Sequence, residues 1–271
     1  MQQHETEVLL TENLQLSSAF LERIVTITCF FPRQELYAYR NPIHLLLIND
    51  GQNMEELGLA GILSEMLTAD ELAPLACVAI HSARDRKVEY GTASSTDYMG
   101  RGAKAGAYAK FVLEELMPFI SATYGMASFA SKSFAGFSLG GLSALDIVWN
   151  HPQEFLRVGV FSGSLWWRTR ALENGYQEET DRIMHAQVRA GGYYPWLKFF
   201  FETGTQDETM DRNNNGIIDA IDDTLGLVAE LVAKGYNRQK DIRYLELKEG
   251  RHDIATWACA MPVFLKWGWG R

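Results

Sequence analysis

The chain alternates between short apolar runs and longer segments whose apolar residues recur at helical spacing. Runs typical of the buried strands of a parallel sheet lie at 43–48, 75–80, 133–137, 158–161 and 197–202. A last strand is predicted at 243–247, and helices are predicted at 57–67, 105–120, 142–149, 224–234 and 254–267. Strands that alternate with helices predict an α/β fold with a mostly parallel, doubly wound sheet flanked by helices. No repeat or interdomain linker interrupts the pattern, so 1–271 is predicted to be a single domain.

Several segments depart from this alternation. Residues 21–31 are rich in β-branched and aromatic side chains and, with 8–10, predict an antiparallel hairpin at the N-terminus. Residues 81–103 are polar and irregular, and 168–195 form a mixed helical and loop insertion. Both segments are expected to shape a ligand pocket. Proline is expected to kink or restart the helix at Pro118 and to break the last helix at Pro262.

The sharpest chemical signal is the G-x-S-x-G turn formed by Gly136, Ser138 and Gly140. It lies between a predicted strand and a predicted helix, the context in which such a serine acts as a nucleophile. Side chains larger than hydrogen at the two glycine positions would clash in this strained turn. A Gly/Ser-rich turn without chemistry is the alternative, and the strand–turn–helix context favours the nucleophile.

A serine nucleophile needs a base and an acid, which follow it along the chain in the order serine, acid, histidine. His252 follows the last predicted strand and is favoured over His185, which lies in the insertion and could be a solvated side chain. Asp207 follows the strand at 197–202 and is the preferred acid. Glu208 and Asp211 remain competitors, because order and position alone do not separate them.

The developing oxyanion needs two backbone N–H donors. One is expected from Leu139, directly after the nucleophile, and Gln52 is the candidate in the loop after the strand at 43–48. Trp166 and Trp167 follow the neighbouring strand. They are candidates for an aromatic wall against which a substrate binds, although packing in the core is an equal alternative.

A second signal is a twelve-residue match to the EF-hand calcium loop over 211–222. The expected ligand positions are Asp211, Asn213, Asn215, Ile217, Asp219 and Asp222. Asp222 replaces the usual glutamate, which puts the affinity in doubt, and an acidic Asn/Gly turn is the alternative. A bound Ca²⁺ is expected to be structural, because it would brace the turn that follows Asp207. No organic cofactor is expected.

Composition and charge narrow the function further. Hydrophobic residues make up 47% of the 271 residues, and the net charge of −9 argues against nucleic acid or an anionic membrane as partner. The chain has neither a basic, signal-like start nor an apolar run of membrane-spanning length, so a cytoplasmic location is expected. A small-molecule ester is the expected partner, and nothing in the sequence indicates an oligomeric state.

With these residues assembled, the chain resembles the putative-esterase branch of the α/β-hydrolase superfamily. This branch includes esterase D, enterochelin-esterase-like proteins, feruloyl esterase domains and the antigen-85 mycolyltransferases. The segments that carry the resemblance are 47–52, 108–124, 136–140, 162–167, 204–207 and 250–252. The resemblance implies a Ser138–His252–Asp207 triad with oxyanion donors at Leu139 and Gln52.

A serine carboxylesterase that works through an acyl-enzyme is the function implied, with a carbohydrate or siderophore ester as a possible substrate. Acyl transfer to an alcohol is the first alternative. A non-catalytic calcium-binding protein on a hydrolase scaffold is the second. A peptidase is disfavoured by the resemblance.

Overall fold

A computed structural model describes residues 3–5, 8–33 and 43–271. Within these residues nine strands form one sheet in the order β1-β2-β3-β5-β4-β6-β7-β8-β9. The strands are β1 Gln3–Glu5, β2 Leu9–Ser18, β3 Arg23–Pro32, β4 His44–Asn49, β5 Leu75–Ile80, β6 Lys132–Phe137, β7 Arg157–Phe161, β8 Lys198–Gln206 and β9 Ile242–Arg251. From β5 to β9 every neighbouring pair is parallel, whereas β1, β2 and β3 are antiparallel. The predicted parallel sheet and N-terminal hairpin are therefore confirmed.

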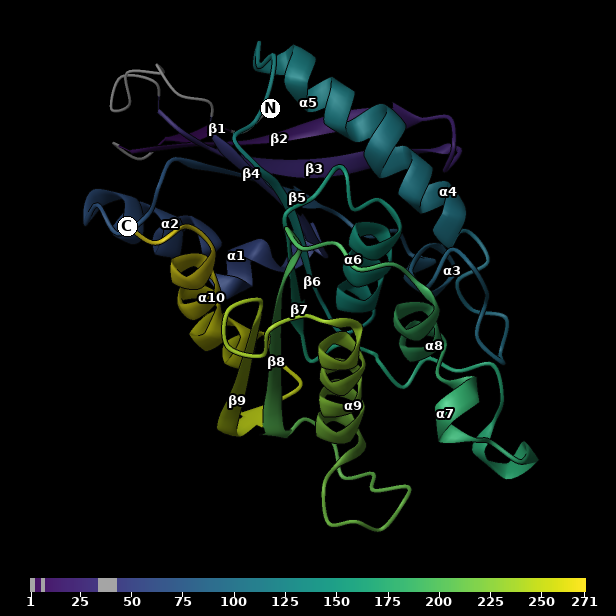
Figure 1. Ribbon diagram of the computed structural model, residues 1–271. Helices are drawn as coiled ribbons and strands as arrows, with labels where there is room; N and C mark the ends of the chain where they lie inside the picture. Colours follow the sequence, from purple (N-terminus) through teal and green to yellow (C-terminus); the bar gives the residue numbers. More distant parts are fainter. Residues whose placement is uncertain (1–2, 6–7, 34–42) are drawn as a thin grey trace.

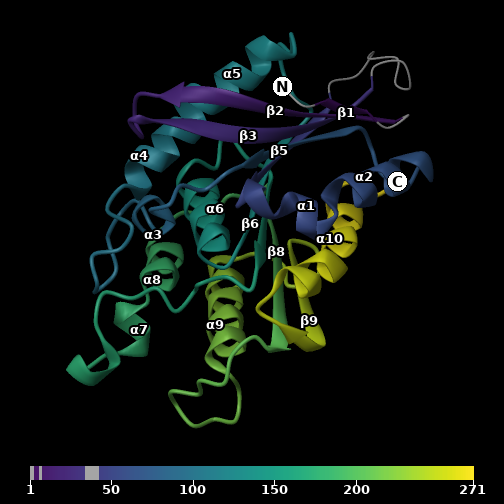
Figure 2. The same cartoon turned by 180° about the vertical axis from the view of Figure 1, so that it is seen from behind.

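Helices cover both faces of the sheet (Figures 1 and 2). Along the chain these are α1 Met54–Leu57, α2 Leu59–Thr68, α3 Arg86–Glu89, α4 Ala105–Lys110, α5 Met117–Thr123, α6 Leu139–Asn150, α7 Glu178–Asp181, α8 Ile183–Ala190, α9 Asp219–Lys234 and α10 Ile254–Trp269. Short 3₁₀ turns lie at Gly51–Asn53 and Leu172–Asn174. One hydrophobic core includes residues of α4, α5, α6, α8 and α9, and the other includes residues of α1, α2 and α10.

The two cores explain why the central strands are apolar without interruption. In β4, Leu45 and Leu47 belong to one core, and Leu46 and Ile48 belong to the other. Successive side chains of a strand point to opposite faces, so a strand covered on both faces needs an apolar residue at every position.

Both prolines that were expected to interrupt helices lie within continuous helical backbone. Pro118 lies in the first turn of α5, directly after a π-helical segment, Phe111–Leu116. The wider π turn continues the helical path from α4 into α5. The predicted break at Pro262 is wrong, because α10 runs from Ile254 to Trp269 through it. The lost hydrogen bond is offset by burial of that helix against the sheet.

Among the elements that are longer than the sequence predicts, two strands and one helix bear on the candidate site. β8 continues to Gln206 and β9 to Arg251, so Asp207 and His252 follow directly at the carboxyl ends of their strands. α9 begins at Asp219 and so includes the end of the predicted calcium loop. In the residues the structure describes, no helix has the length and apolarity needed to cross a membrane.

Candidate functional site

Ser138 occupies a strained turn between β6 and α6. Its φ of 54° and ψ of −122° lie in a region that non-glycine residues rarely adopt. A Cβ on Gly136 would lie 2.3 Å from the carbonyl oxygen of Gly140. A Cβ on Gly140 would lie 2.5 Å from a carboxylate oxygen of Asp50. The glycines therefore leave room for this backbone, and its geometry is that of the predicted serine turn.

Polar groups from the end of β4 and from α3 brace the serine turn. Asn49 donates a hydrogen bond of 2.7 Å from Nδ2 to the carbonyl of Gly140. Arg86 makes a bidentate ion pair with Asp50, at 2.6 and 2.7 Å, and donates to the carbonyl of Phe137 at 3.1 Å. Because bidentate pairs fix direction as well as distance, the chain on both sides of Ser138 is held in place.

The surroundings of the Ser138 hydroxyl are polar. Its Oγ lies 3.4 Å from Oγ of Ser164. None of the hydrogen bonds found among the described residues joins the Ser138 hydroxyl to His252. Catalytic hydrogen bonds are often long in the absence of substrate and tighten in the complex.

The two predicted oxyanion donors come from elements that flank the serine turn. Leu139 is the first residue of α6, and the first amides of a helix have no partner within it. Gln52 lies in the 3₁₀ turn after β4. Its side chain donates to Asp50 at 3.3 Å and accepts from the amide of Ser82 at 3.0 Å.

The register of β8 and β9 brings Asp207 and His252 to the same edge of the sheet. A β-bulge shifts the pairing so that Gln206 lies opposite Arg251. Asp207 directly follows Gln206, and His252 directly follows Arg251, so the two residues leave the sheet side by side. The backbones also approach closely here, since a Cβ on Gly204 would lie 2.3 Å from Gly250.

The electrostatics of this edge link the acid and the histidine. Burial raises the pKa of Asp207, while the nearby backbone of Gly204 and the charge of His252 act in the opposite direction. Desolvation lowers the pKa of His252, Asp207 raises it, and the positive charge of Arg86 lowers it again. His252 therefore lies within electrostatic reach of the predicted acid and of the arginine that contacts the serine turn.

Trp257 in α10 connects the two parts of the site. Its ring lies 5.4 Å from that of His252 in an edge-to-face arrangement and 5.0 Å from that of Phe137. Its Nε1 donates a 3.0 Å hydrogen bond to the hydroxyl of Ser162. The indole thus packs between the histidine and the residue before Ser138.

The structure also shows site residues that the sequence reasoning missed. Arg86 lies in the irregular segment after β5, and nothing in its surroundings along the chain indicates a role. Trp257 is one of seven tryptophans, with no distinguishing pattern. Glu202 carried a usable signal, because it ends the run of three phenylalanines in a buried strand, where a carboxyl is unusual.

The structure also places the three alternative residues that the sequence left open. His185 is fully buried, its Nε2 lies 2.8 Å from the carbonyl oxygen of Asp223, and burial lowers its pKa to about 3. The interpretation of His185 as a solvated side chain is therefore wrong, because α8 packs this face against α9. Glu208 lies one residue beyond Asp207, and burial raises its pKa. The carboxylate of Asp211 accepts from the amides of Asn215 and Gly216.

The two predicted aromatic wall residues differ in exposure. Trp167 is fully buried, and its ring fills the space beside Gly91 and Gly102, as the packing alternative describes. Trp166 is half-buried, with the guanidinium of Arg101 over its ring at 5.0 Å. Of the pair, only Trp166 exposes ring surface to solvent.

The predicted calcium loop brings most of its oxygen-bearing side chains together. The amide nitrogens of Asn213 and Asn215 lie 2.9 and 3.4 Å from the two carboxylate oxygens of Asp222. Asp211 closes the turn through the amides of Asn215 and Gly216. The Asp219 carboxylate instead accepts from the backbone of Arg212 at 2.9 Å.

The donor set of this loop suits a hard cation, because it consists of carboxylate, amide and carbonyl oxygens, including the carbonyl of Ile217. Two of its positions are asparagines. In the described part of the chain no group of three or more His, Cys, Asp or Glu side chains is arranged to hold a metal.

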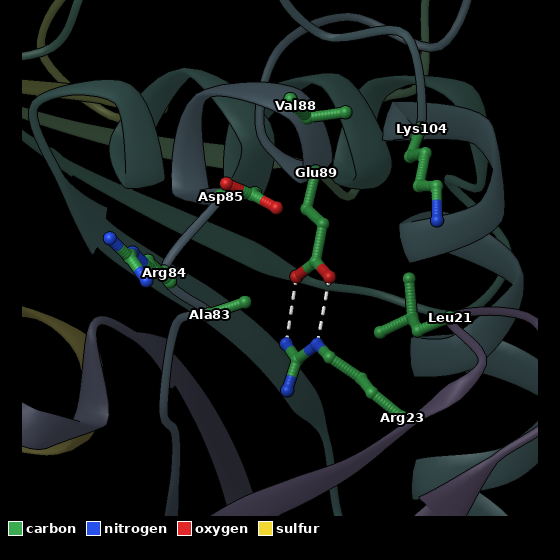
Figure 3. Close-up of a pocket in the computed structure, with 8 residues that line it drawn as sticks. All are labelled: Leu21, Arg23, Ala83, Arg84, Asp85, Val88, Glu89 and Lys104. Carbon is green, nitrogen blue, oxygen red and sulfur yellow. Dashed lines mark hydrogen bonds and ion pairs between the residues drawn. The ribbon is translucent and has the colours of Figure 1, made fainter.

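A cavity of about 340 Å³ lies beside the segment after β5 and is separate from the serine turn (Figure 3). Figure 3 shows the bidentate pair between Arg23 and Glu89 at its centre, with distances of 2.7 Å. None of the predicted catalytic residues lines it.

Comparison with known proteins places the chain in a family. Residues 18–267 match the family described as "Putative esterase". The chain belongs to this esterase family. The resemblance predicted from the sequence is therefore confirmed.

Several curated relatives of the chain are named as siderophore esterases. The Escherichia coli (strain K12) protein named iron(III) enterobactin esterase is 32% identical over 109 residues, which cover 39% of this chain and 26% of that protein. The siderophore triacetylfusarinine C esterase of Aspergillus fumigatus is 26% identical over 110 residues, covering 40% of this chain and 37% of that protein. The chain thus matches well under two thirds of the length of these relatives.

Solved structures of esterases share the fold. The enterobactin esterase of Shigella flexneri, solved in the presence of enterobactin, superposes with a TM-score of 0.71 at 19% identity, over 94% of this chain and 57% of that chain. The siderophore hydrolase EstB of Aspergillus nidulans gives 0.69 at 16% identity, over 94% and 95%. The predicted α/β-hydrolase fold is confirmed.

Proposed function

We propose that this protein is a serine carboxylesterase in which Ser138 is the nucleophile, His252 the base and Asp207 the acid. The observation that carries the proposal is the strained serine turn after β6, with the acid and the histidine directly after the paired ends of β8 and β9 at the same edge of the sheet. Membership of the esterase family supports the same reaction class.

The proposed reaction proceeds by acyl transfer. His252 removes the proton of Ser138 as the serine oxygen attacks the ester carbonyl, and Asp207 stabilises the imidazolium that forms. The amides of Leu139 and Gln52 donate hydrogen bonds to the carbonyl oxygen and so stabilise the negative charge that develops on it. His252 then protonates the leaving alcohol, and water releases the acyl group from the serine by the same steps in reverse order.

For the substrate we propose an ester of the siderophore class. Its support is the names of curated relatives from bacteria and from a fungus, which hydrolyse different siderophores. A panel of enterobactin and triacetylfusarinine C, each with and without iron, is compared with acetylated and feruloylated sugars. Faster hydrolysis of the siderophores supports the proposal, and faster hydrolysis of the sugar esters contradicts it. The same products, analysed with an added alcohol, distinguish hydrolysis from acyl transfer.

The catalytic proposal is tested by Ser138→Ala on a simple aryl ester. We expect kcat/KM to fall by about 10³-fold or more, because the covalent step is lost. Ser164→Ala is the matched control, since it removes the neighbouring hydroxyl and leaves the nucleophile in place. An unchanged rate in a folded Ser138→Ala protein, shown by an unaltered melting temperature, contradicts the assignment.

We propose separately that the loop over 211–222 binds a structural Ca²⁺. The twelve-residue match and the convergence of Asn213, Asn215 and Asp222 support this, provided that both amides turn oxygen toward the ion. Binding to the folded state alone would stabilise it by about 2.7 kcal/mol at 100 times the Kd.

The calcium proposal is tested by thermal unfolding in calcium and in chelator. We expect calcium to raise Tm by several degrees, at about 2–4 °C per kcal/mol for a domain of this size. The rise should vanish in Asp211→Ala and persist in Glu56→Gln, which removes an exposed charge elsewhere. A calcium-induced rise that survives Asp211→Ala, or no rise in the unmodified protein, would overturn the proposal.

A further inference from the structure

Glu202 is a buried carboxyl next to the proposed catalytic acid. It lies in β8, five residues before Asp207, and is fully inaccessible to solvent. Side chains alternate along a strand, so Glu202 lies on the same side of the sheet as Phe200, the side that α10 covers. A buried ionised carboxylate is costly unless it is paired. Among the described residues, no lysine or arginine is a cause of the shift in its pKa.

The hydroxyl of Ser162 lies between this carboxyl and the rest of the site. Ser162 directly follows β7 and has a φ of 44°. This left-handed backbone conformation is strained for a residue other than glycine. The Oγ of Ser162 lies 3.4 Å from Oε2 of Glu202 and accepts a hydrogen bond from Nε1 of Trp257. The same hydroxyl is close enough to lower the pKa of Asp207.

Three carboxyl oxygens around this serine are short of partners. Within the part of the chain that the structure describes, Oε1 of Glu202 and both oxygens of Asp207 are buried without a hydrogen bond of ordinary geometry. A serine hydroxyl has one proton to donate and can accept two. It therefore cannot donate to Glu202 and to Asp207 at the same time.

The competing demands on the Ser162 hydroxyl are met if Glu202 holds a proton, although Oε1 of Glu202 still has no partner among the described residues. Its O–H then donates to Ser162, which also accepts from Trp257 and donates its own proton to Asp207. Every hydrogen-bonding site of the Ser162 hydroxyl is then used, and Asp207 keeps its second oxygen for His252. Burial and the nearby charge of Asp207 raise the pKa of Glu202 to about 8, in agreement with a proton held at neutral pH.

We propose that Glu202 is a positioning residue that, as a neutral carboxylic acid, orients Asp207 through the hydroxyl of Ser162. This inference rests on the proposed triad, because it assigns Glu202 a role through Asp207. Among the described residues, Asp207, from the loop after β8, acts on the charge of Glu202, and Tyr244, on β9 but on the other side of the sheet, is affected by that charge. The pKa of that tyrosine is itself raised, mainly by burial. Tyr244 therefore stays neutral in the range where Glu202 titrates.

The kinetic test compares three variants with the unmodified enzyme on an aryl ester from pH 5.5 to 9.5. Glu202→Gln keeps a donor to Ser162 and cannot ionise, so kcat at pH 6.5 should stay within about threefold. Glu202→Leu has no donor, so kcat should fall about tenfold or more with KM unchanged. Glu246→Gln, an exposed carboxyl on β9, is the matched control and should change neither.

The pH profile separates positioning from mere packing. In the unmodified enzyme, ionised Glu202 accepts the hydrogen bond of the Ser162 hydroxyl, which then no longer donates to Asp207. We therefore expect kcat to decline through an ionisation near pH 8. This decline should be absent in Glu202→Gln. An alkaline limb shared by both proteins overturns the proposal. Equal losses of kcat in the Gln and Leu variants also overturn it, because a packing role does not depend on a donor.

An infrared measurement tests the proton without catalysis. The difference spectrum between the unmodified protein and Glu202→Gln at pH 6.5 should contain the carbonyl band of a protonated carboxylic acid. Its absence contradicts the inference even in an active enzyme. If the unmodified protein hydrolyses no ester, the catalytic proposal fails, whereas the band still decides whether Glu202 holds a proton.

Discussion

The serine turn and the acid–histidine edge differ in how their polar groups are held. Around Ser138 the backbone carbonyls of Phe137 and Gly140 accept hydrogen bonds from Arg86 and Asn49. After β8, both carboxylate oxygens of Asp207 are buried and, within the described residues, make no hydrogen bond of ordinary geometry. The serine turn is thus held by hydrogen bonds that are already formed. In our proposal, Asp207 is instead held by the hydroxyl of Ser162, whose hydrogen bond depends on the protonation of Glu202.

This difference has a physical cause. A strained backbone persists only where its surroundings over-determine it, so the serine turn requires rigid support. The base gains and loses a proton during the proposed reaction and the acid stabilises its charged form, so the pKa values of both matter more than fixed contacts. We therefore expect changes at the turn to alter stability and changes at the edge to alter pH dependence.

The largest effect on rate is expected from Asp207→Asn. An amide keeps the shape of the side chain and removes the charge that stabilises the imidazolium, so kcat should fall by about 10³- to 10⁴-fold. Steady-state kinetics on an aryl ester checks this, with Glu208→Gln as the neighbouring control. A comparable loss in Glu208→Gln with an active Asp207→Asn would assign the acid to Glu208.

Gly140→Ala should be a damaging small change at the serine turn. The added methyl would meet a carboxylate oxygen of Asp50 at 2.5 Å, and Arg86 holds that carboxylate in place. Overpacking of this kind costs about 1–3 kcal/mol, which lowers Tm in thermal unfolding. Gly61→Ala, in α2 with open space around it, should leave Tm unchanged or raise it slightly. Equal melting temperatures for the two variants would contradict the crowding.

The pH dependence should reveal the charges around His252. The base acts in its neutral form, so kcat/KM should rise through an apparent pKa below the ordinary value of about 6.5, since the pKa of His252 is lowered. Asp207 raises that pKa and Arg86 lowers it. The acid limb should therefore move to lower pH in Asp207→Asn and to higher pH in Arg86→Gln. Shifts in the same direction would show that these charges do not act on the base.

Much of the fold can be predicted from the sequence, because its signals are local. The strands β4 and β5 are covered on both faces, so their apolar runs mark them with little ambiguity. The turn at Ser138 is predictable because its glycines answer a steric need between residues close in the chain. The N-terminal hairpin is likewise visible from its β-branched and aromatic residues.

Features that depend on distant partners could not be predicted. The polar ends of β8 and β9 are strands because they pair with each other, and the bulge that sets the register of Gln206 and Arg251 leaves no mark in either segment. Arg86 reaches the serine turn from 51 residues away. The path of α10 through Pro262 depends on packing against the sheet, which local propensity does not contain.

The most direct test of the proposed esterase is covalent labelling with a fluorophosphonate, followed by peptide mass spectrometry. The account predicts a single phosphonylated peptide with the adduct on Ser138. Labelling should be abolished in Ser138→Ala and slowed strongly in His252→Gln, because the hydroxyl is then without its base. An unlabelled protein, an adduct on another serine, or equal labelling of the His252→Gln variant would contradict the account.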